Sequence, residues 1–313
     1  MAPRCAIRVP RAKDMVISMT NRRGNNTRYI IVSPVKDEAS YIRETLDSVV
    51  AQTIRPYIWL IVDDSSTDGT EEIVRSYCAK HDWIRLQINN RTGQRNTGSA
   101  EVIAFSLGYG MIRNEDFDFI VKLDGDLRLE SDYFEKLFIE FEKNPALGIA
   151  SGIYLEQHGS GWLPVPMPGY HAAGATKVIR KKCFEEIGGF IDTPGWDTVD
   201  EIRAWVKGWR TAHFENAIFH HFKNEGSGMG YRKTNLMHGE IFYLTGGTKA
   251  FFLGKVAKRI AIGQPFLLAG IYMFLGYLRP MIKKQPLLVT REESKLYRKM
   301  LRDRLMTGRL PGR

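Results

Sequence analysis

Residues 119–126 read FIVKLDGD, a short apolar run that ends on two aspartates separated by a glycine. The run at 119–123 has the length and the continuous apolar character of a strand buried on both faces, which is typical of parallel sheets. Asp124 and Asp126 follow at once, and Gly125 between them permits a close backbone approach to a ligand. An Asp-x-Asp pattern alone is common in exposed turns. Its position directly after a buried strand favours a functional site over a surface turn.

Outward from this stretch, apolar runs alternate with segments of helical periodicity. The runs at 29–33, 58–62 and 84–88 are predicted strands, and helices are predicted between them and after the last. This order is typical of βαβ units. It predicts an α/β fold with a largely parallel sheet. Beyond a further strand at 149–155, we expect a long loop at 158–173, rich in glycine, proline and aromatic residues.

A second acidic cluster, Asp63-Asp64, follows the strand at 58–62. The carboxyl ends of parallel strands share one edge of a sheet, and ligands bind there. Two acidic clusters on one edge repel each other unless a cation lies between them. Oxygen ligands are those that Mg²⁺ and Mn²⁺ prefer, and phosphate oxygens can complete the set. The sequence therefore predicts a divalent cation, Mn²⁺ or Mg²⁺, held beside Asp124 and Asp126.

The net charge of +10 is concentrated at the two ends of the chain. Residues 1–28 carry a net +6 and residues 279–313 a net +8, so residues 29–278 carry −4. A nucleic-acid-binding protein usually places its basic residues on a folded face. Basic ends around an acidic body instead suit an anionic membrane surface, or are solvated tails. We therefore expect no nucleic-acid partner, and a peripheral position on the cytoplasmic face of a membrane.

Three motifs resemble, in order and spacing, those of family 2 glycosyltransferases with the GT-A fold: VSPVKDE at 32–38, VDDSSTDGT at 62–70 and KLDGD at 122–126. The resemblance covers about 29–243. It implies a single GT-A domain whose largely parallel sheet is Rossmann-like and binds a nucleotide. It also implies an inverting, metal-dependent enzyme that moves one sugar from a nucleoside-diphosphate sugar to an acceptor. The residues that it implies around the donor are Pro34, Glu38, Asp63 and Ser65 at the nucleoside, Asp124 near the ribose and the metal, and Asp126 on the metal.

Such an enzyme needs a general base for the acceptor hydroxyl. The family supplies it from an acidic pair at a helix start, and the matching place here reads GWDTVDE at 195–201. Trp196 stands where the family has glutamate, so we assign the base to Asp197. Asp200 and Glu201 are competitors, although acids at a helix start are also favoured by the helix dipole.

Two further side chains are candidates with open alternatives. Lys122 either faces a donor phosphate or points to the other side of the sheet. His220 and His221 follow the apolar run 217–219, and one of them, taken here as His220, is a candidate third metal ligand. A packed or solvated histidine is the alternative for this position.

We expect three segments: a basic leader at 1–28, a glycosyltransferase domain at 29–258 and membrane-associating helices at 259–313. The uncharged run 265–278 is about 21 Å long as a helix, which is short for a bilayer core of about 30 Å. The segment at 296–305 has one apolar face surrounded by lysine and arginine, which suits a helix lying in lipid headgroups. Packing of 266–278 on the sheet is the alternative.

The expected acceptor is a lipid-linked or cell-surface polysaccharide precursor. A polyprenyl-phosphate sugar transferase of the same fold is the alternative function, because a phosphate acceptor needs no strong base. A nucleotidyltransferase is disfavoured because residues 33–38 contain no glycine-rich loop.

Overall fold

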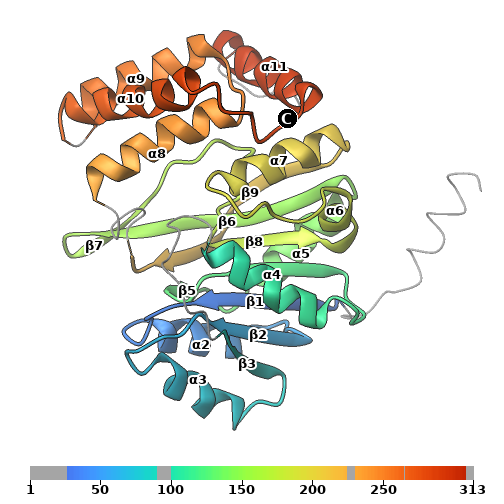
Figure 1. Cartoon of the computed structure of the whole chain (residues 1–313). Helices are drawn as coiled ribbons and strands as arrows, with labels where there is room; N and C mark the ends of the chain where they lie inside the picture. Colours follow the sequence, from blue (N-terminus) through green and yellow to red (C-terminus); the bar gives the residue numbers. More distant parts are fainter. Residues whose placement is uncertain (1–26, 90–99, 224–229, 264, 308–313) are drawn as a thin grey trace, which may run out of the picture.

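The computed structural model describes residues 27–89, 100–223, 230–263 and 265–307, so residues 1–26 of the expected leader lie outside it. Its strands form one sheet in the order β3-β2-β1-β4-β8-β6-β9-β5, with β7 paired to β6 (Figure 1). The strands are β1 (Tyr29–Val35), β2 (Ile58–Asp63), β3 (Ile84–Ile88), β4 (Phe119–Leu123), β5 (Leu127–Leu129), β6 (Leu147–His158), β7 (Gly161–Pro164), β8 (Thr176–Arg180) and β9 (Arg210–His221). The helices are α2 (Ile42–Val50), α3 (Thr70–Cys78), α4 (Ala100–Ile112), α5 (Tyr133–Lys143), α6 (Lys181–Glu186), α7 (Trp196–Val206), α8 (Tyr231–Leu244), α9 (Lys249–Ile262), α10 (Leu268–Ile282) and α11 (Arg291–Thr307).

The predicted α/β architecture is confirmed in the first half of the chain. Strands β3, β2, β1 and β4 are parallel to one another. Every residue of β1, β2 and β4 is buried. Both faces are covered because α2, α3 and α5 pack on the face that carries Tyr29 and Trp59, while α4 and α6 pack on the other. This accounts for the continuous apolar runs in the sequence.

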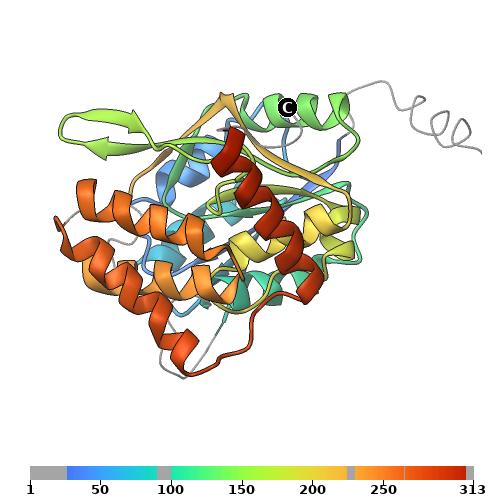
Figure 2. The same cartoon turned by 90° about the horizontal axis from the view of Figure 1, so that it is seen from above.

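The second half of the sheet is mixed, so the prediction of a largely parallel sheet needs correction. Strand β8 runs antiparallel to β4 and β6, and β5 runs antiparallel to β9, while β9 is parallel to β6. Residues 161–164, expected within a loop, form β7. Strand β6 is 12 residues long, and its last part pairs with β7 on one side while Leu155 and Glu156 still pair with β9 on the other. The β6–β7 hairpin projects from the molecule (Figure 2).

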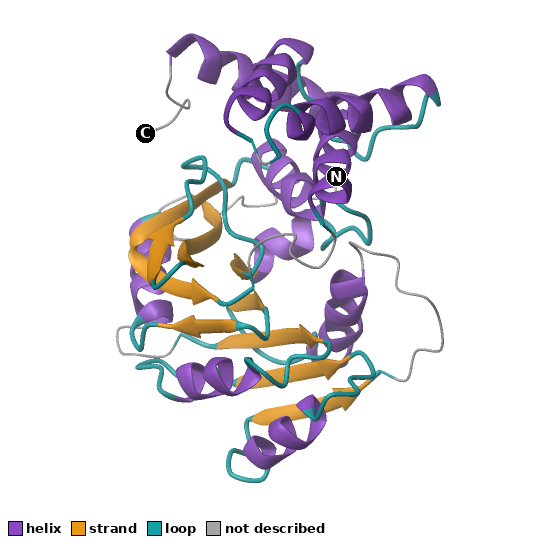
Figure 3. Ribbon diagram, turned by 90° about the vertical axis from the view of Figure 1, so that its left-hand side faces the viewer, coloured by secondary structure: helices purple, strands orange, loops and turns teal. Residues whose placement is uncertain are grey.

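Helices α8–α11 gather at the end of the molecule opposite β3 (Figures 1 and 3). Together with α7 they enclose a separate apolar cluster that includes Ile202, Phe252, Met273 and Tyr297. The helices α8 and α10 approach so closely that a Cβ atom on Gly239 would lie 1.9 Å from the carbonyl oxygen of Met273. The expected boundary at 258/259 lies within α9.

Helix α11 has the amphipathic pattern expected from the sequence, but part of its apolar face is buried against protein. Tyr297 and Leu301 belong to the cluster shared with α7, whereas Leu305 is exposed. None of the helices in the described ranges combines the length and the apolar character needed to cross a bilayer.

Candidate active site

A cleft of about 210 Å³ opens at the carboxyl ends of β1, β2 and β4. Its lining comes from five segments that are distant in sequence: Pro34, Val35, Lys36 and Glu38; Asp64; Ala100, Glu101 and Ala104; Asp124, Gly125 and Asp126; and His221. The turn after β4 closes tightly against β1, since a Cβ atom on Gly125 would lie 2.9 Å from Cγ1 of Val35. A glycine is therefore needed between the two aspartates. The edge predicted from strand order is where the acidic groups meet.

At the end of β2, Asp63 is buried and one of its carboxylate oxygens has a partner. Oδ1 accepts a hydrogen bond from the backbone N–H of Ser66 at 2.7 Å, while Oδ2 is buried with no hydrogen-bond partner in the described residues. Burial raises the pKa of Asp63. Ser65, in the left-handed region at φ 60°, donates its hydroxyl to the carbonyl of Asn89 at 2.8 Å. A buried carboxylate oxygen without a partner is a position where a ligand can donate a hydrogen bond.

Glu38, in the turn after β1, lines the cleft. Its Oε2 is 2.5 Å from Nζ of Lys223, a residue 185 positions away. Burial raises the pKa of Glu38 to about 7 despite this cation. The pair joins the turn after β1 to the segment after β9, so it fixes the wall of the cleft.

Lys122, the one charged residue of β4, is buried and points to Asp124. Its Nζ lies 2.6 Å from Oδ1 of Asp124 and 3.4 Å from Oε2 of Glu101. Burial would lower the pKa of Lys122, but the two carboxylates outweigh it and raise the pKa. Of the two alternatives for this side chain, the structure therefore places it on the cleft side, paired with protein carboxylates.

The two histidines that end β9 lie on different sides of the strand, as successive strand residues must. His221 Nε2 lies 3.4 Å from Oδ2 of Asp126 and lines the cleft. His220, the candidate from the sequence, is registered with Arg128 and packs edge-on against Trp162, with ring centroids 4.7 Å apart. The histidine beside the acidic pair is thus His221 and not His220.

A preformed metal site is absent from the described residues, where no group of three or more His, Cys, Asp and Glu side chains is arranged to hold an ion. Asp126 and His221 nevertheless offer an oxygen and a nitrogen donor on the cleft wall, and these donor types suit Mn²⁺. Asp124 is next to them but engaged by Lys122. The residues fit a cation whose remaining ligands come from a bound diphosphate.

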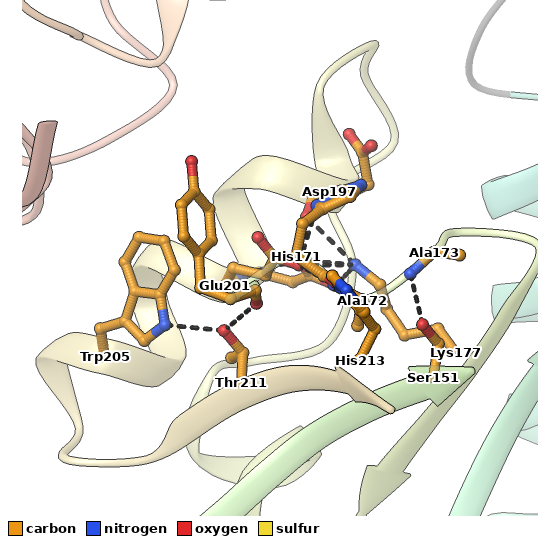
Figure 4. A network of polar contacts seen from close by, with 12 residues as sticks. Ser151, His171, Ala172, Ala173, Lys177, Asp197, Glu201, Trp205, Thr211 and His213 are labelled. Carbon is orange, nitrogen blue, oxygen red and sulfur yellow. Dashed lines mark hydrogen bonds and ion pairs between the residues drawn. The ribbon is translucent and has the colours of Figure 1, made fainter. Parts of the chain in front are cut away.

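At the start of α7, the three candidate bases have different surroundings. Lys177, wholly buried, lies 2.9 Å from Asp200 and 3.9 Å from Glu201, and both acids are buried. Glu201 also accepts a hydrogen bond from the N–H of Ala172 at 2.7 Å and lies 3.0 Å from Nδ1 of His171. Figure 4 shows the carboxylate of Asp197 directed away from this network; only its backbone carbonyl accepts a hydrogen bond from Lys177, at 3.1 Å. The geometry thus favours Asp197, whose side chain is half-buried, over its two competitors.

Glu101 was missed by sequence reasoning. It begins α4, lines the cleft and accepts a hydrogen bond from the indole N–H of Trp196 at 3.0 Å. Lys223, the partner of Glu38, was missed as well. Neither has a local signal, because their partners are 95 and 185 residues away and only the tertiary fold brings them together.

Comparison with known families gives a match to the model described as glycosyl transferase family 2, over residues 30–196. The chain belongs to glycosyl transferase family 2. The matched range begins in β1 and ends at the first residue of α7, so it includes both acidic clusters. The resemblance seen in the three motifs is confirmed.

Curated relatives of this family 2 chain are distant. It is 24% identical over 234 residues to the glycosyltransferase GlyA of Streptococcus pneumoniae, which covers 72% of this chain and 30% of that protein. It is 26% identical over 194 residues to the putative glycosyltransferase EpsE of Bacillus subtilis, which covers 57% of this chain and 66% of that protein. A poly-β-1,6-N-acetyl-D-glucosamine synthase of Staphylococcus epidermidis is 26% identical over 37% of the chain and 26% of its own length. The chain therefore spans from about a quarter to just under two thirds of these relatives.

Solved structures share the fold. The mannosyltransferase PcManGT of Pyrobaculum calidifontis, in complex with GDP-Man and Mn²⁺, matches with a TM-score of 0.52 at 16% identity, over 90% of this chain and 81% of that one. TarS residues 1–349 of S. aureus, in complex with UDP-GlcNAc, match with a TM-score of 0.52 at 15% identity, over 91% and 93% of the two chains. At these identities the likeness establishes the GT-A-like fold of the family 2 chain and nothing finer.

Proposed function

We propose that this family 2 glycosyltransferase is an inverting, metal-dependent enzyme that transfers one sugar from a nucleoside-diphosphate sugar to a polysaccharide precursor. One observation carries the proposal: the acidic turn after β4 and Glu101 line a single cleft, and Glu101 contacts both Lys122 and Trp196, the first residue of α7. A nucleotide sugar has its diphosphate at one end and its reacting carbon at the other. The acidic turn would face the diphosphate, and the start of α7 would face the reacting carbon.

The nucleoside end is proposed to lie against β1 and β2. Pro34 and Glu38 line the cleft there, and the partnerless Oδ2 of Asp63 can accept a hydrogen bond from a base N–H. Ser65 follows in the same turn, and Asp124 lies on the side where the ribose would join the diphosphate. The complexes of related folds with GDP-Man and UDP-GlcNAc support a nucleoside-diphosphate sugar as the donor.

The reaction then needs one displacement. The acceptor hydroxyl oxygen forms a bond to the anomeric carbon while the bond from that carbon to the diphosphate breaks, and the hydroxyl proton passes to the carboxylate of Asp197. The nucleoside diphosphate leaves with the bonding electrons. A divalent cation on Asp126, with His221 in place of His220, would neutralise the charge that develops on this leaving group.

A binding panel tests the proposal. Thermal shifts are measured for UDP-, GDP- and dTDP-sugars with Mn²⁺, with Mg²⁺ and with EDTA, on the unmodified protein, Asp126→Asn and the control Asp82→Asn, whose exposed carboxyl lies outside the cleft lining. We expect at least one donor to stabilise the unmodified protein and the control only with a divalent cation, and Asp126→Asn to lose this response. A fully cation-dependent response in Asp126→Asn would remove Asp126 from the metal site.

We further propose that the enzyme works at the cytoplasmic face of an anionic membrane, on a lipid-linked acceptor. Helices α9 and α10 and the residues between them expose large apolar side chains: Leu253, Ile262, Phe266, Leu267, Leu268, Ile271, Phe274, Leu275 and Ile282. Residues 230–290 hold nine lysines and arginines and a single acid, Glu240. An apolar surface with a basic surround suits insertion among anionic headgroups. It also favours the second candidate function, a polyprenyl-phosphate sugar transferase, since such an acceptor is itself a lipid.

Sedimentation with vesicles tests the membrane proposal. The double variant Ile271→Glu, Leu275→Glu should bind phosphatidylserine vesicles about tenfold more weakly than the unmodified protein, because two charges enter the apolar face. The matched control, Leu107→Glu with Met111→Glu, alters two exposed apolar residues of α4 and should bind as the unmodified protein does. Equal binding of all three proteins would exclude this face as the membrane contact.

A further inference from the structure

The residue before the proposed base is Trp196, at the position where the resemblance to the family's motifs implies a glutamate. The indole of Trp196 is buried, 5% exposed, and its ring lies between two lysines, with Nζ of Lys122 and of Lys177 at 5.2 and 5.1 Å from the ring centroid. The ring therefore occupies a fixed position at the start of α7. It carries no acceptor, so on its own it cannot replace a carboxylate.

Glu101 brings a carboxylate to this place from another element. Oε1 accepts the hydrogen bond from Nε1 of Trp196 at 3.0 Å, and Oε2 lies 3.4 Å from Nζ of Lys122. Each oxygen is thus held by one donor. Because the side chain is 43% exposed and lines the cleft, the remaining lone pairs are accessible from it.

The position of Glu101 within the cleft indicates what it can bind. On one side, Lys122 connects it to Asp124, next to the proposed metal and diphosphate. On the other side, Trp196 connects it to Asp197, the proposed base. The transferred sugar must lie between the diphosphate and the base, since its anomeric carbon is bonded to the first and attacked by the hydroxyl that the second deprotonates. Glu101 is therefore beside the sugar rather than the nucleoside.

We propose that Glu101 forms a subsite for the hydroxyl groups of the transferred sugar. This inference rests on the proposed function. Sugar hydroxyls are hydrogen-bond donors, and a carboxylate already oriented by two other donors accepts from them without further loss of side-chain freedom. A site built to bind a hydroxyl also discriminates strongly against a sugar that lacks it.

The test separates the sugar from the nucleotide. Dissociation constants of UDP and of UDP-GlcNAc, or of the corresponding pair from whichever donor class binds in the panel, are measured by calorimetry with Mn²⁺. For Glu101→Ala we expect at least about tenfold weaker binding of the nucleotide sugar, as for loss of a hydrogen bond to a charged group, and binding of the nucleoside diphosphate within about twofold of the unmodified protein. Glu101→Gln, which keeps an acceptor oxygen, should lie between the two.

Two controls keep the outcome interpretable. Glu142→Gln, an exposed glutamate of α5, should change neither constant. Trp196→Phe keeps an aromatic ring but removes the N–H that orients Glu101. It should therefore weaken the binding of the nucleotide sugar more than the binding of the nucleoside diphosphate. Far-ultraviolet circular dichroism establishes that each variant is folded.

Three results would overturn the inference. Unchanged binding of the nucleotide sugar to Glu101→Ala would exclude the subsite while leaving the proposed function intact. An equal loss of affinity for both ligands would mean that Glu101 contacts the nucleotide part of the donor or stabilises the fold. Binding of neither ligand class to the unmodified protein would reject the proposed function and the subsite with it.

Discussion

Asp197 is the second residue of α7, and the contacts of its neighbours determine whether another acid could serve as the base. Asp200 and Glu201 are committed to Lys177, whereas the carboxylate of Asp197 points away from that cation. We expect Asp197→Asn to lower sugar transfer by roughly 10²-fold or more, the range for loss of a general base, with donor affinity nearly unchanged. Initial rates and donor dissociation constants measure the two quantities. Near-normal turnover would mean that the acceptor needs no base, as a phosphate acceptor would not.

His171 gives the network behind α7 a pH dependence. Burial lowers its pKa, but the charge of Glu201 outweighs burial and raises the pKa to about 9, against an ordinary value of 6.5. A histidine with a raised pKa stabilises the fold fully below its unfolded pKa, and this contribution is lost as the pH rises through the folded pKa. The stabilisation by His171 should therefore fall between pH 6.5 and 9.

Urea unfolding of the unmodified protein and His171→Gln across this range measures the effect. The comparison cancels the contribution of titratable groups that lie far from His171 and are common to both proteins. The difference in free energy of unfolding should shrink by on the order of 1 kcal/mol or more from pH 6.5 to pH 9, given about 1.4 kcal/mol for each pKa unit. A difference that stays constant over this range would contradict the assignment of the ion pair.

For single residues, the sequence predicted that the acids after β2 and β4 lie close together, because residues that directly follow parallel buried strands share one edge of the sheet. It could not distinguish His220 from His221. The register of β9 against β6 shifts between Gly152 paired with Phe214 and Ile153 paired with Ile218, so strand parity counted from the start of β9 does not carry through to its end. The contact between Glu101 and Trp196 spans 95 residues and has no sequence signal.

The packing of helix α4 on the sheet can be tested with two of its own glycines, because their surroundings differ. A Cβ atom on Gly108 would lie 2.7 Å from Cγ2 of Val62 and 2.8 Å from Cγ1 of Val32, while one on Gly110 would meet nothing within 4 Å. Gly108→Ala should destabilise the protein by about 1–3 kcal/mol through overpacking. Gly110→Ala should stabilise it by up to about 1 kcal/mol, since alanine favours helix over glycine. Urea unfolding measures both, and a shift of the same sign in both variants would refute this packing of α4 on the sheet.

Helix α11 illustrates a limit of element-level prediction. An apolar stripe flanked by basic residues is expected both for a helix that packs on protein and for one that lies in a headgroup layer. Tyr297 and Leu301 follow the first description, because α7 presents an apolar surface to them. The exposed large apolar side chains lie instead on α9, on α10 and between these two helices. The mixed half of the sheet was equally unpredictable, since strand direction depends on long-range pairing.

For the whole molecule, α8–α11 share their apolar cluster with α7, which carries Asp197. Truncation after Lys258 would remove α10, α11 and part of α9 from that cluster and expose Ile202 and Phe252. We expect the truncated protein to melt at a lower temperature, to aggregate and to lose transferase activity. A truncated protein with the melting temperature and donor affinity of the full chain would show that the C-terminal helices are an independent attachment.

The central claim is that the cleft transfers a sugar from a nucleoside-diphosphate donor, and product analysis tests it most directly. The protein is incubated with the panel of nucleotide sugars, Mn²⁺ and a membrane extract as acceptor, and the released nucleotide is identified by chromatography. We predict release of a nucleoside diphosphate that depends on the divalent cation and is abolished in Asp126→Asn. Release of pyrophosphate, or no turnover of any nucleotide sugar, would contradict the account.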